Sequence, residues 1–377
     1  MEYGIENLVT VARRDHNLIR PYLYVNPLQG KHIPVEPDRP LELFRKMAEI
    51  LDEKYPAERL LLIGFAETAT AIGAGISAYS DVVKYCMQTT REVYPNTNYL
   101  YFTESHSHAA QQSLITEGLE KALTDTDRVI FAEDEVTTSD TICKLIAALR
   151  KKYPDIEMKF GIISILNSMS EKRIKELEYG NVHCQYICRI PFGYGDKDFG
   201  GMVFGNFKSV FCDKEPQIYE MNTDVPDFRF IWEKRSYTEL ILKYAGRILS
   251  CIHIDKTWKK VLVLGTEEFM YPPMLIADRI SRENPFLKVV FHATTRSPIL
   301  TSSAKDYPLY SRLEIASLYD PQRRTYIYNL ENYDAVILIS DACFSSEAAK
   351  SILDALRGTE CSEIYIFGRE SNDEKQL

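Results

Sequence analysis

Short apolar runs alternate with amphipathic segments along the first half of the sequence. The apolar runs that predict strands cover residues 59–65, 82–88, 99–103, 128–132 and 158–166. The segments with helical periodicity between them cover residues 41–54, 68–80, 110–123 and 141–152. Strands that read as continuous apolar runs separated by helices are typical of a mostly parallel sheet covered on both faces. The pattern predicts an α/β fold.

Residues 180–235 interrupt this alternation with many glycines and aromatic residues. We interpret them as loops and short β structure that close a first domain, followed by a linker at 226–234. A helical pattern over 236–251 then opens a second domain. A chain of 377 residues is too long for one ordinary core, so we predict two domains, residues 1–232 and 233–377.

The second domain repeats features of the first in the same order. Residues 61–64, Leu-Leu-Ile-Gly, have a counterpart in 262–265, Leu-Val-Leu-Gly, and Thr-Thr-Arg at 89–91 recurs at 294–296. The strand that ends in Glu-Asp at 133–134 has a counterpart that ends in Ser-Asp at 340–341. These matches predict two mostly parallel-sheet domains, the second a degenerate repeat of the first. Chance similarity between α/β units is the alternative.

Composition and charge narrow the function classes. Hydrophobic residues make up 45% of the chain, charged residues 26%, and the formal net charge is −9. Without a basic excess, a large nucleic-acid footprint is not expected, although a small anionic ligand still fits. The N-terminal residues lack the pattern of a signal peptide, and no apolar run is long enough to span a bilayer. We predict a cytoplasmic protein.

The eight cysteines are scattered, which favours reduced thiols over a disulfide framework. Cys184 and Cys188, with His183 beside them, raise the question of a metal site. Their spacing is not that of a zinc site, and residues 182–190 have the pattern of a strand, which we favour.

The segment that carries the most chemistry runs from residue 128 to 141. An apolar strand delivers Glu133 and Asp134, and a loop of Thr137, Thr138 and Ser139 then turns into a helix at Asp140 and Thr141. Strand ends in open α/β sheets line ligand crevices, and a helix start can hold a phosphate through backbone amides and the helix dipole. The carboxylates suit ribose hydroxyls, directly or through Mg²⁺.

This segment resembles the signature with which type I phosphoribosyltransferases bind 5-phosphoribosyl-1-pyrophosphate (PRPP). The resemblance places Glu133 and Asp134 on the family's acid pair, with Mg²⁺ as cofactor, and residues 137–141 on the loop that holds the 5-phosphate. Ser139 departs from the pattern, since the signature has glycine there. The alternative is a helix capped by Ser139 or Asp140 behind surface acids.

Two further segments match the family in the expected order. Ala66, Glu67 and Thr68 fall on its first pyrophosphate loop, where the resemblance implies a cis peptide bond that does not involve proline. Arg91 falls on a basic position that faces pyrophosphate. A polar strand end is the alternative for residues 89–91.

The family inserts a mobile hood between Arg91 and residue 110, and its implied role is to exclude water while pyrophosphate leaves. In this sequence the insertion contains His106 and His108, two residues apart. We predict that they contact substrate or pyrophosphate, and with Arg91 they form the predicted catalytic set. Metal ligation and a solvated loop are the alternatives.

Near the N-terminus, Lys31 and His32 follow Gly30 in a segment that resembles the basic cover of the base pocket in orotate-type members. Contact with an anionic or acceptor-rich substrate is the implied role. A surface turn is the alternative.

Thr-Arg-Ser-Pro at 295–298 is the four-letter signature of the TRSP domain, which follows orotate phosphoribosyltransferase-like domains in a bacterial group linked to tellurium-resistance and stress-response gene clusters. The resemblance implies a transferase of nucleotide metabolism that uses PRPP or pyrophosphate with a base-like small molecule. It also implies a homodimer, with other stress-cluster proteins as partners. A non-catalytic nucleotide sensor and a scaffold of a stress complex are the alternatives.

Overall fold

The computed structural model describes residues 3–15, 20–102, 111–191, 193–205, 216–223, 225–343 and 346–369. The chain divides into two compact units. The first comprises residues 1–5, 41–192 and 226–241, and the second comprises 6–40, 193–225 and 242–377. Each unit is described by itself.

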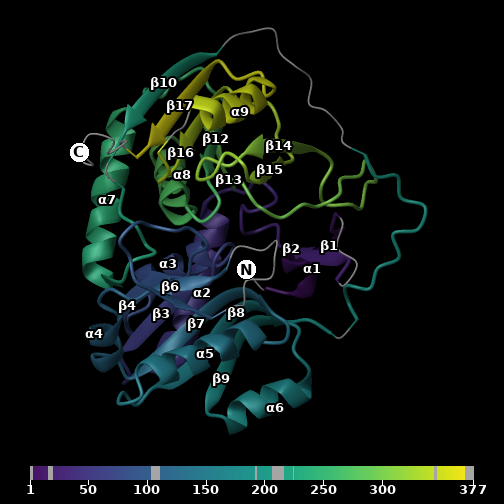
Figure 1. Ribbon diagram of the computed structural model, residues 1–377. Helices are drawn as coiled ribbons and strands as arrows, with labels where there is room; N and C mark the ends of the chain where they lie inside the picture. The colour runs from purple at the N-terminus through teal and green to yellow at the C-terminus, as the bar shows by residue number, and fades with distance from the viewer. Residues whose placement is uncertain are drawn as a thin grey trace. The chain divides into compact units, whose positions relative to one another are not determined.

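The first unit is built on one six-stranded sheet (Figure 1). Its strand order is β11-β4-β3-β7-β8-β9, and all pairs are parallel except β11 with β4. The strands are β3 (Leu60–Gly64), β4 (Val83–Gln88), β7 (Arg128–Val136), β8 (Lys159–Asn167), β9 (Val182–Arg189) and β11 (Trp232–Glu233). A separate hairpin pairs β5 (Tyr99–Tyr101) with β6 (Ser113–Ile115).

The helices of this unit are α2 (Asp38–Lys54), α3 (Thr70–Tyr79), α4 (Leu119–Thr124), α5 (Asp140–Lys152) and α6 (Glu171–Tyr179). Strand β3 is buried at every residue, and α3 packs on β3, β4 and β7. In Figure 1, α5 lies in front of the strands, and α6 lies beside β9 at the lower right. The predicted parallel α/β architecture is confirmed.

The structure differs from the predicted elements at two places in this unit. The helix predicted over 110–123 is wrong in its first half, since residues 113–115 pair with β5 and only α4 is helical. The linker predicted at 226–234 contains β11, which extends the first sheet. Helix α7 (Lys234–Ser250) follows it directly. Local periodicity could not reveal either pairing, because both depend on distant residues.

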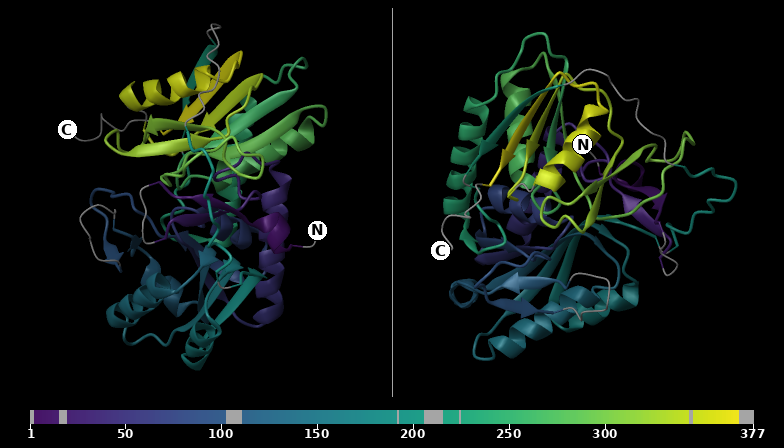
Figure 2. Two further views of the ribbon diagram at one scale, coloured as in Figure 1. Left: turned by 90° about the vertical axis from the view of Figure 1, so that its right-hand side faces the viewer. Right: turned by 45° about the horizontal axis from the view of Figure 1, so that its top comes forward.

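The second unit has a five-stranded, fully parallel sheet of order β10-β17-β16-β12-β13. Its strands are β10 (Gln217–Asn222), β12 (Lys260–Gly265), β13 (Lys288–Ala293), β16 (Ala335–Ile339) and β17 (Glu363–Gly368). The helices are α8 (Tyr271–Glu283), which packs on β12 and β13, and α9 (Ser346–Arg357). A hairpin pairs β14 (Arg312–Ala316) with β15 (Arg324–Tyr328) (Figure 2).

Residues 6–40 belong to the second unit, although the sequence analysis placed them in the first domain. They begin with α1 (Ile5–Leu8) and the hairpin of β1 (Thr10–Arg13) and β2 (Tyr22–Val25). Val35 exchanges backbone hydrogen bonds with Phe291 of β13, and Ala12 and Val25 share a buried cluster with Ile299. The N-terminal segment therefore completes the core of the C-terminal unit.

The two sheets share one strand order, which supports the predicted repeat. Apart from the edge strand β11, the series β4-β3-β7-β8-β9 corresponds to β13-β12-β16-β17-β10, and every pair in both series is parallel. The first four strands of each series also follow the same order along the chain. The fifth differs, since β10 precedes the other strands of its sheet.

No helix in the described part of the chain is long and apolar enough to cross a membrane. The seven cysteines within it are free thiols. Residues 183–188 lie on β9, as the strand interpretation predicted. Across the described residues, no group of three or more His, Cys, Asp or Glu side chains is placed to hold a metal ion.

The end of β3 permits a direct test of packing. A Cβ atom on Gly64 would lie 2.7 Å from the carbonyl oxygen of Ala69, so Gly64→Ala should lower the free energy of unfolding by about 1–3 kcal/mol. Gly246→Ala, in α7 with no atom near its added Cβ, should leave stability unchanged or raise it by up to about 1 kcal/mol. Urea unfolding of both variants measures the difference. Equal stabilities would contradict the tight approach at Gly64.

Candidate active site

The loop between β3 and α3, residues 65–69, is tied to both strands that flank β3. The backbone N–H of Phe65 donates to the carbonyl oxygen of Ala132 on β7 at 3.1 Å. The N–H of Ala66 donates to the hydroxyl of Thr89, just after β4, at 2.9 Å. The loop is thus fixed at the carboxyl edge of the sheet, where open α/β sheets bind ligands.

Within this loop the peptide bond between Ala66 and Glu67 is cis, as the family resemblance implied. Ala66 is buried, and its carbonyl accepts a 2.8 Å hydrogen bond from the side chain of Gln112. Glu67 and Thr68 are half-buried. Sequence reasoning did not single out Gln112, which lies far along the chain from the loop it contacts.

The chain leaves β4 through two fully buried threonines. The N–H of Thr89 donates to the carbonyl of Gly64 at 2.9 Å, and Thr90 exchanges two backbone hydrogen bonds with Ser113 at 2.9 and 3.0 Å. Arg91 follows this anchored pair and is half-buried. The sequence places a cation beside the loop at 65–69, because β3 and β4 are parallel neighbours.

Glu133 and Asp134 lie on β7 itself, which runs on to Val136. Burial raises the pKa of Glu133 well above its ordinary value of 4.5, and the neighbouring Asp134 carboxylate raises that pKa further. A buried carboxyl whose ionisation is disfavoured by burial and by a neighbouring carboxylate is typical of a site that receives a cation or hydroxyl groups.

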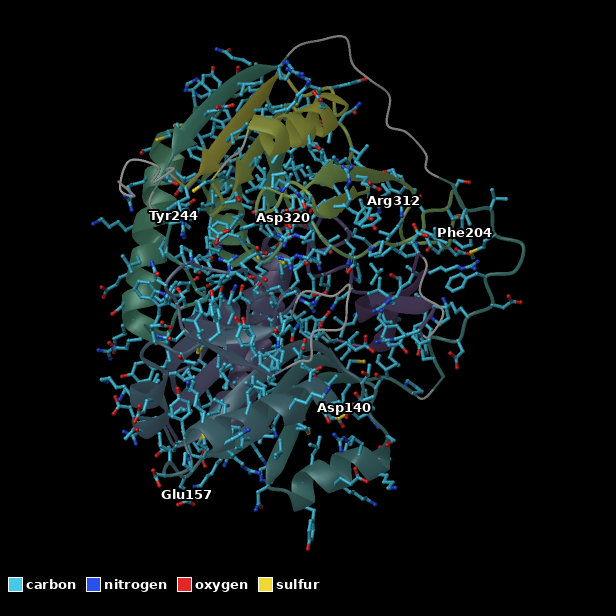
Figure 3. The ribbon with its side chains drawn as sticks, in the orientation of Figure 1. Asp140, Glu157, Phe204, Tyr244, Arg312 and Asp320 are labelled. Carbon is cyan, nitrogen blue, oxygen red and sulfur yellow. The ribbon has the colours of Figure 1, made fainter. Side chains whose placement is uncertain are left out.

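The loop after β7 enters α5 through a left-handed residue. Ser139 has φ +60°, and its side chain makes no capping hydrogen bond to the helix, so the capped-helix interpretation does not hold for this residue. A left-handed conformation costs a non-glycine residue about 1–2 kcal/mol. Asp140, labelled in Figure 3, is the exposed first residue of α5, and Thr141 follows it half-buried.

Arg173 of α6 holds this loop. Its Nε donates to the carbonyl oxygen of Thr138 at 2.9 Å and to the hydroxyl of Ser139 at 3.0 Å. Its Nη2 lies 3.3 Å from a carboxylate oxygen of Asp140. The serine that stands at position 139, where the family signature has glycine, is therefore hydrogen-bonded by the guanidinium of Arg173. The sequence analysis did not identify Arg173, and the serine at 139 was the signal that such a partner is needed.

Lys31 and His32 occupy a different place from the predicted one. Both are buried in the second unit rather than exposed on a turn. The Lys31 ammonium donates to the backbone carbonyls of Glu267 at 3.0 Å and Thr294 at 3.4 Å. The His32 ring packs edge-on against Tyr328. Their burial excludes the surface-turn alternative, and contact with substrate stays a prediction.

The predicted catalytic residues His106 and His108 lie outside the described residues. Arg91, Glu133, Asp134 and the residues of the two loops are the predicted site residues that the structure brings to one sheet edge.

Two family models match the sequence. Residues 8–190 match the phosphoribosyl transferase model, and residues 229–356 match the TRSP domain found C-terminal to it. The chain belongs to the phosphoribosyl transferase family that carries a C-terminal TRSP domain. The protein is therefore a phosphoribosyltransferase, as the sequence analysis predicted. A search of curated proteins gives no match.

Solved structures similar to the chain include three adenine phosphoribosyltransferases. The enzyme of Giardia lamblia, complexed with 9-deazaadenine, is 11% identical with a TM-score of 0.35, and the match covers 49% of this chain and 95% of that one. The enzyme of Trypanosoma brucei, in complex with AMP, pyrophosphate and ribose-5-phosphate, is 13% identical with a TM-score of 0.33, and the match covers 49% of this chain and 77% of that one. The enzyme of Leishmania tarentolae is 13% identical with a TM-score of 0.36, and the match covers 49% of this chain and 85% of that one.

The acid pair of this phosphoribosyl transferase predicts a pH-dependent stability. Because folding raises the pKa of Glu133, the folded state binds its proton more tightly than the unfolded state does. The stabilisation is complete below the ordinary carboxyl range and is lost as the pH rises through the raised pKa. Glu133→Gln should therefore gain stability relative to wild type between pH 5 and pH 8, measured by thermal unfolding.

Glu178→Gln, which removes an exposed carboxylate from α6, is the control for loss of one charge. A stability difference between Glu133→Gln and wild type that stays constant with pH would contradict the assignment.

Proposed function

We propose that this phosphoribosyltransferase uses PRPP with Mg²⁺ and transfers its phosphoribosyl group to a base or base-like small molecule, or runs in reverse with pyrophosphate. One observation carries the proposal. The loop at 65–69, the Thr89–Arg91 turn and the acid pair meet at the ends of three adjacent parallel strands, and hydrogen bonds from Phe65 and Ala66 join them.

The acid pair fits Mg²⁺ by the chemistry of its donors. Mg²⁺ prefers hard oxygen ligands and is usually held by one or two carboxylates together with substrate phosphates. Glu133 and Asp134 would hold it, and its charge would favour the ionised form of Glu133 that burial now disfavours. When bound, the metal supplies positive charge to the diphosphate of the substrate.

The loop of residues 137–141 would bind the 5-phosphate. Threonine hydroxyls and the backbone amides at the start of α5 are donors, and the helix dipole favours a negative charge there. Arg173 shapes this loop from outside through Thr138 and Ser139. Glu133 and Asp134 would accept hydrogen bonds from the ribose hydroxyls on the neighbouring strand end.

Departure of pyrophosphate is the step that needs charge stabilisation. The backbone of residues 66–68 follows β3 and Arg91 follows the neighbouring β4, so both would meet that charge at this edge of the sheet. A nitrogen nucleophile then forms a bond to the anomeric carbon as the carbon–oxygen bond to pyrophosphate breaks. Holding both reactants in line supplies much of the rate enhancement. Contact of His106 and His108 with the leaving group stays a prediction.

The wider setting is also part of the proposal. A role linked to stress response or tellurite resistance, a homodimer and partners from a stress cluster follow from the family resemblance alone. A cytoplasmic location follows from the sequence pattern.

Calorimetric titration tests PRPP binding directly. Wild type with Mg²⁺ should bind PRPP, and the Glu133→Ala/Asp134→Ala double variant should lose at least ten-fold in affinity, because ribose and metal lose their ligands. The matched control is Asp155→Ala/Glu157→Ala, which removes two exposed acids before β8 at the other edge of the sheet. Folded wild type that binds neither PRPP nor pyrophosphate would contradict the proposal.

A second prediction concerns Arg173. Loss of its charge-assisted hydrogen bonds in Arg173→Gln should weaken PRPP binding by roughly ten-fold, since the loop is no longer held in its left-handed turn. Glycine adopts that conformation without cost, so Ser139→Gly/Arg173→Gln should recover much of the affinity. Lys172→Gln on the same helix controls for charge. Wild-type affinity in Arg173→Gln would show that the loop needs no such support.

A further inference from the structure

The second unit keeps the hydrogen bonds that fix the loop in the first. In the first unit the Thr89 hydroxyl accepts from the N–H of Ala66 at 2.9 Å. In the second, the Thr294 hydroxyl accepts from the N–H of Glu267 at 3.0 Å, and the N–H of Thr294 donates to Gly265 at 3.1 Å. Each acceptor follows the strand beside the loop, and each donor lies two residues after the glycine that ends its strand.

The turn beyond the threonine is also shared. Thr295 exchanges backbone hydrogen bonds with Tyr326 of the hairpin β14–β15 at 2.9 and 2.7 Å, as Thr90 does with Ser113 of the hairpin β5–β6. Arg296 follows Thr295 as Arg91 follows Thr90. The cation expected beside a pyrophosphate loop is therefore present in the second unit.

One residue distinguishes the two loops. The position whose N–H meets the threonine hydroxyl is Ala66 in the first unit and Glu267 in the second. The Glu267 side chain is 1% exposed, and its residue has φ +46°. A left-handed glutamate costs about 1–2 kcal/mol, so strong contacts of the carboxylate must hold it there.

Those contacts are the ones an anionic ligand would receive. Oε2 of Glu267 lies 2.5 Å from Nε of Arg296 and 3.1 Å from Nη2 of Arg323, near the start of β15. Its Oε1 accepts a hydrogen bond of 2.5 Å from the hydroxyl of Ser317. Two guanidinium groups and a hydroxyl around two oxygens form a set of donors suited equally to a phosphate.

A third cation lies behind the loop. The buried Lys31 ammonium donates to the backbone carbonyl of Glu267 at 3.0 Å. The Glu268 carboxylate, fully buried, lies 3.6 Å from Nη2 of Arg296 and balances part of this charge. One buried cation and two half-buried ones gathered here need anions nearby, and the chain supplies the anions from its own loop.

The counterpart of the acid pair is likewise engaged by the chain. Asp341 accepts a hydrogen bond from the hydroxyl of Tyr319, in the turn between β14 and β15. The hydroxyl of Ser340 lies 2.8 Å from that of Thr266. In the second unit, the residue that corresponds to Asp134 is therefore hydrogen-bonded to the hairpin of the same unit.

We propose that the second unit contains an anion site of the pyrophosphate class and that the carboxylate of Glu267 occupies it in the native chain. The unit keeps the fold and the cation of a phosphoribosyl transferase but carries its own counter-anion in place of a ligand. It follows that the native chain has one site for a diphosphate rather than two. Removal of the Glu267 carboxylate should open the second.

Calorimetric titration of inorganic pyrophosphate tests this by stoichiometry. Glu267→Ala should bind one more pyrophosphate per chain than wild type does. Glu267→Ala/Arg296→Gln should return to the wild-type number. Because the count is relative to wild type, it stays informative even if wild type binds no pyrophosphate and the proposed function fails.

Thermal unfolding gives the second readout. Glu267→Gln keeps the shape of the side chain but leaves two arginines without their shared carboxylate, so its Tm should fall. Millimolar pyrophosphate should restore several degrees more to Glu267→Gln and Glu267→Ala than to wild type. When Arg296→Gln is combined with either Glu267 variant, pyrophosphate should raise the Tm no more than it does in wild type. Folded Glu267 variants with unchanged stoichiometry and no extra pyrophosphate shift would overturn the proposal and leave Glu267 in a structural ion pair.

Discussion

A threonine hydroxyl that accepts a hydrogen bond from a loop amide fixes the ligand edge in both halves of this protein. In the first unit the pair is Thr89 with Ala66, and in the second it is Thr294 with Glu267. The bond spans two adjacent parallel strands, so it locks the loop after one strand to the end of the next. Because the threonine is buried, the bond is shielded from water and holds the loop amides in a fixed orientation. The bond also fixes the backbone two residues before the cation that follows, which is Arg91 in the first unit and Arg296 in the second.

The same architecture leads to two electrostatic outcomes. With alanine at the bonded position, the loop of the first unit carries only a small side chain there. The carboxylates of that unit come from the acid pair on β7, and burial disfavours the ionisation of Glu133. With glutamate there, the second unit brings a carboxylate to Arg296 and Arg323 and neutralises them within the chain. A repeat can therefore lose its ligand without losing its fold, since the loss requires only a side chain that imitates the ligand. The N-terminal segment reinforces this by burying Lys31 against the same loop.

Much of this was open to prediction from the sequence, and the limits have physical causes. Apolar runs predicted the parallel sheet, because they depend on local pattern. The family resemblance predicted the cis peptide bond after Ala66 and marked residues 66–68 and the acid pair, because these depend on motif order. The repeat followed from three short matches. The position of Lys31 and His32 in the fold could not be predicted, because a Gly-Lys-His turn carries no information on which sheet it packs against. Arg173 was missed for the same reason: nothing within α6 distinguishes it from the other charged residues of that helix. The filling of the second site by Glu267 depends on a left-handed backbone and on a hairpin about fifty residues away, which no local pattern encodes.

The central claim is that one unit receives the phosphoribosyl donor and the other is filled by its own carboxylate. Hydrogen–deuterium exchange of the wild-type chain, with and without PRPP and Mg²⁺, locates the ligand most directly. The account predicts slower exchange in peptides that contain residues 66–68 and 137–141, and unchanged exchange in peptides that contain residues 266–268 and 294–297. Protection confined to the second set, or equal protection of both, would contradict it.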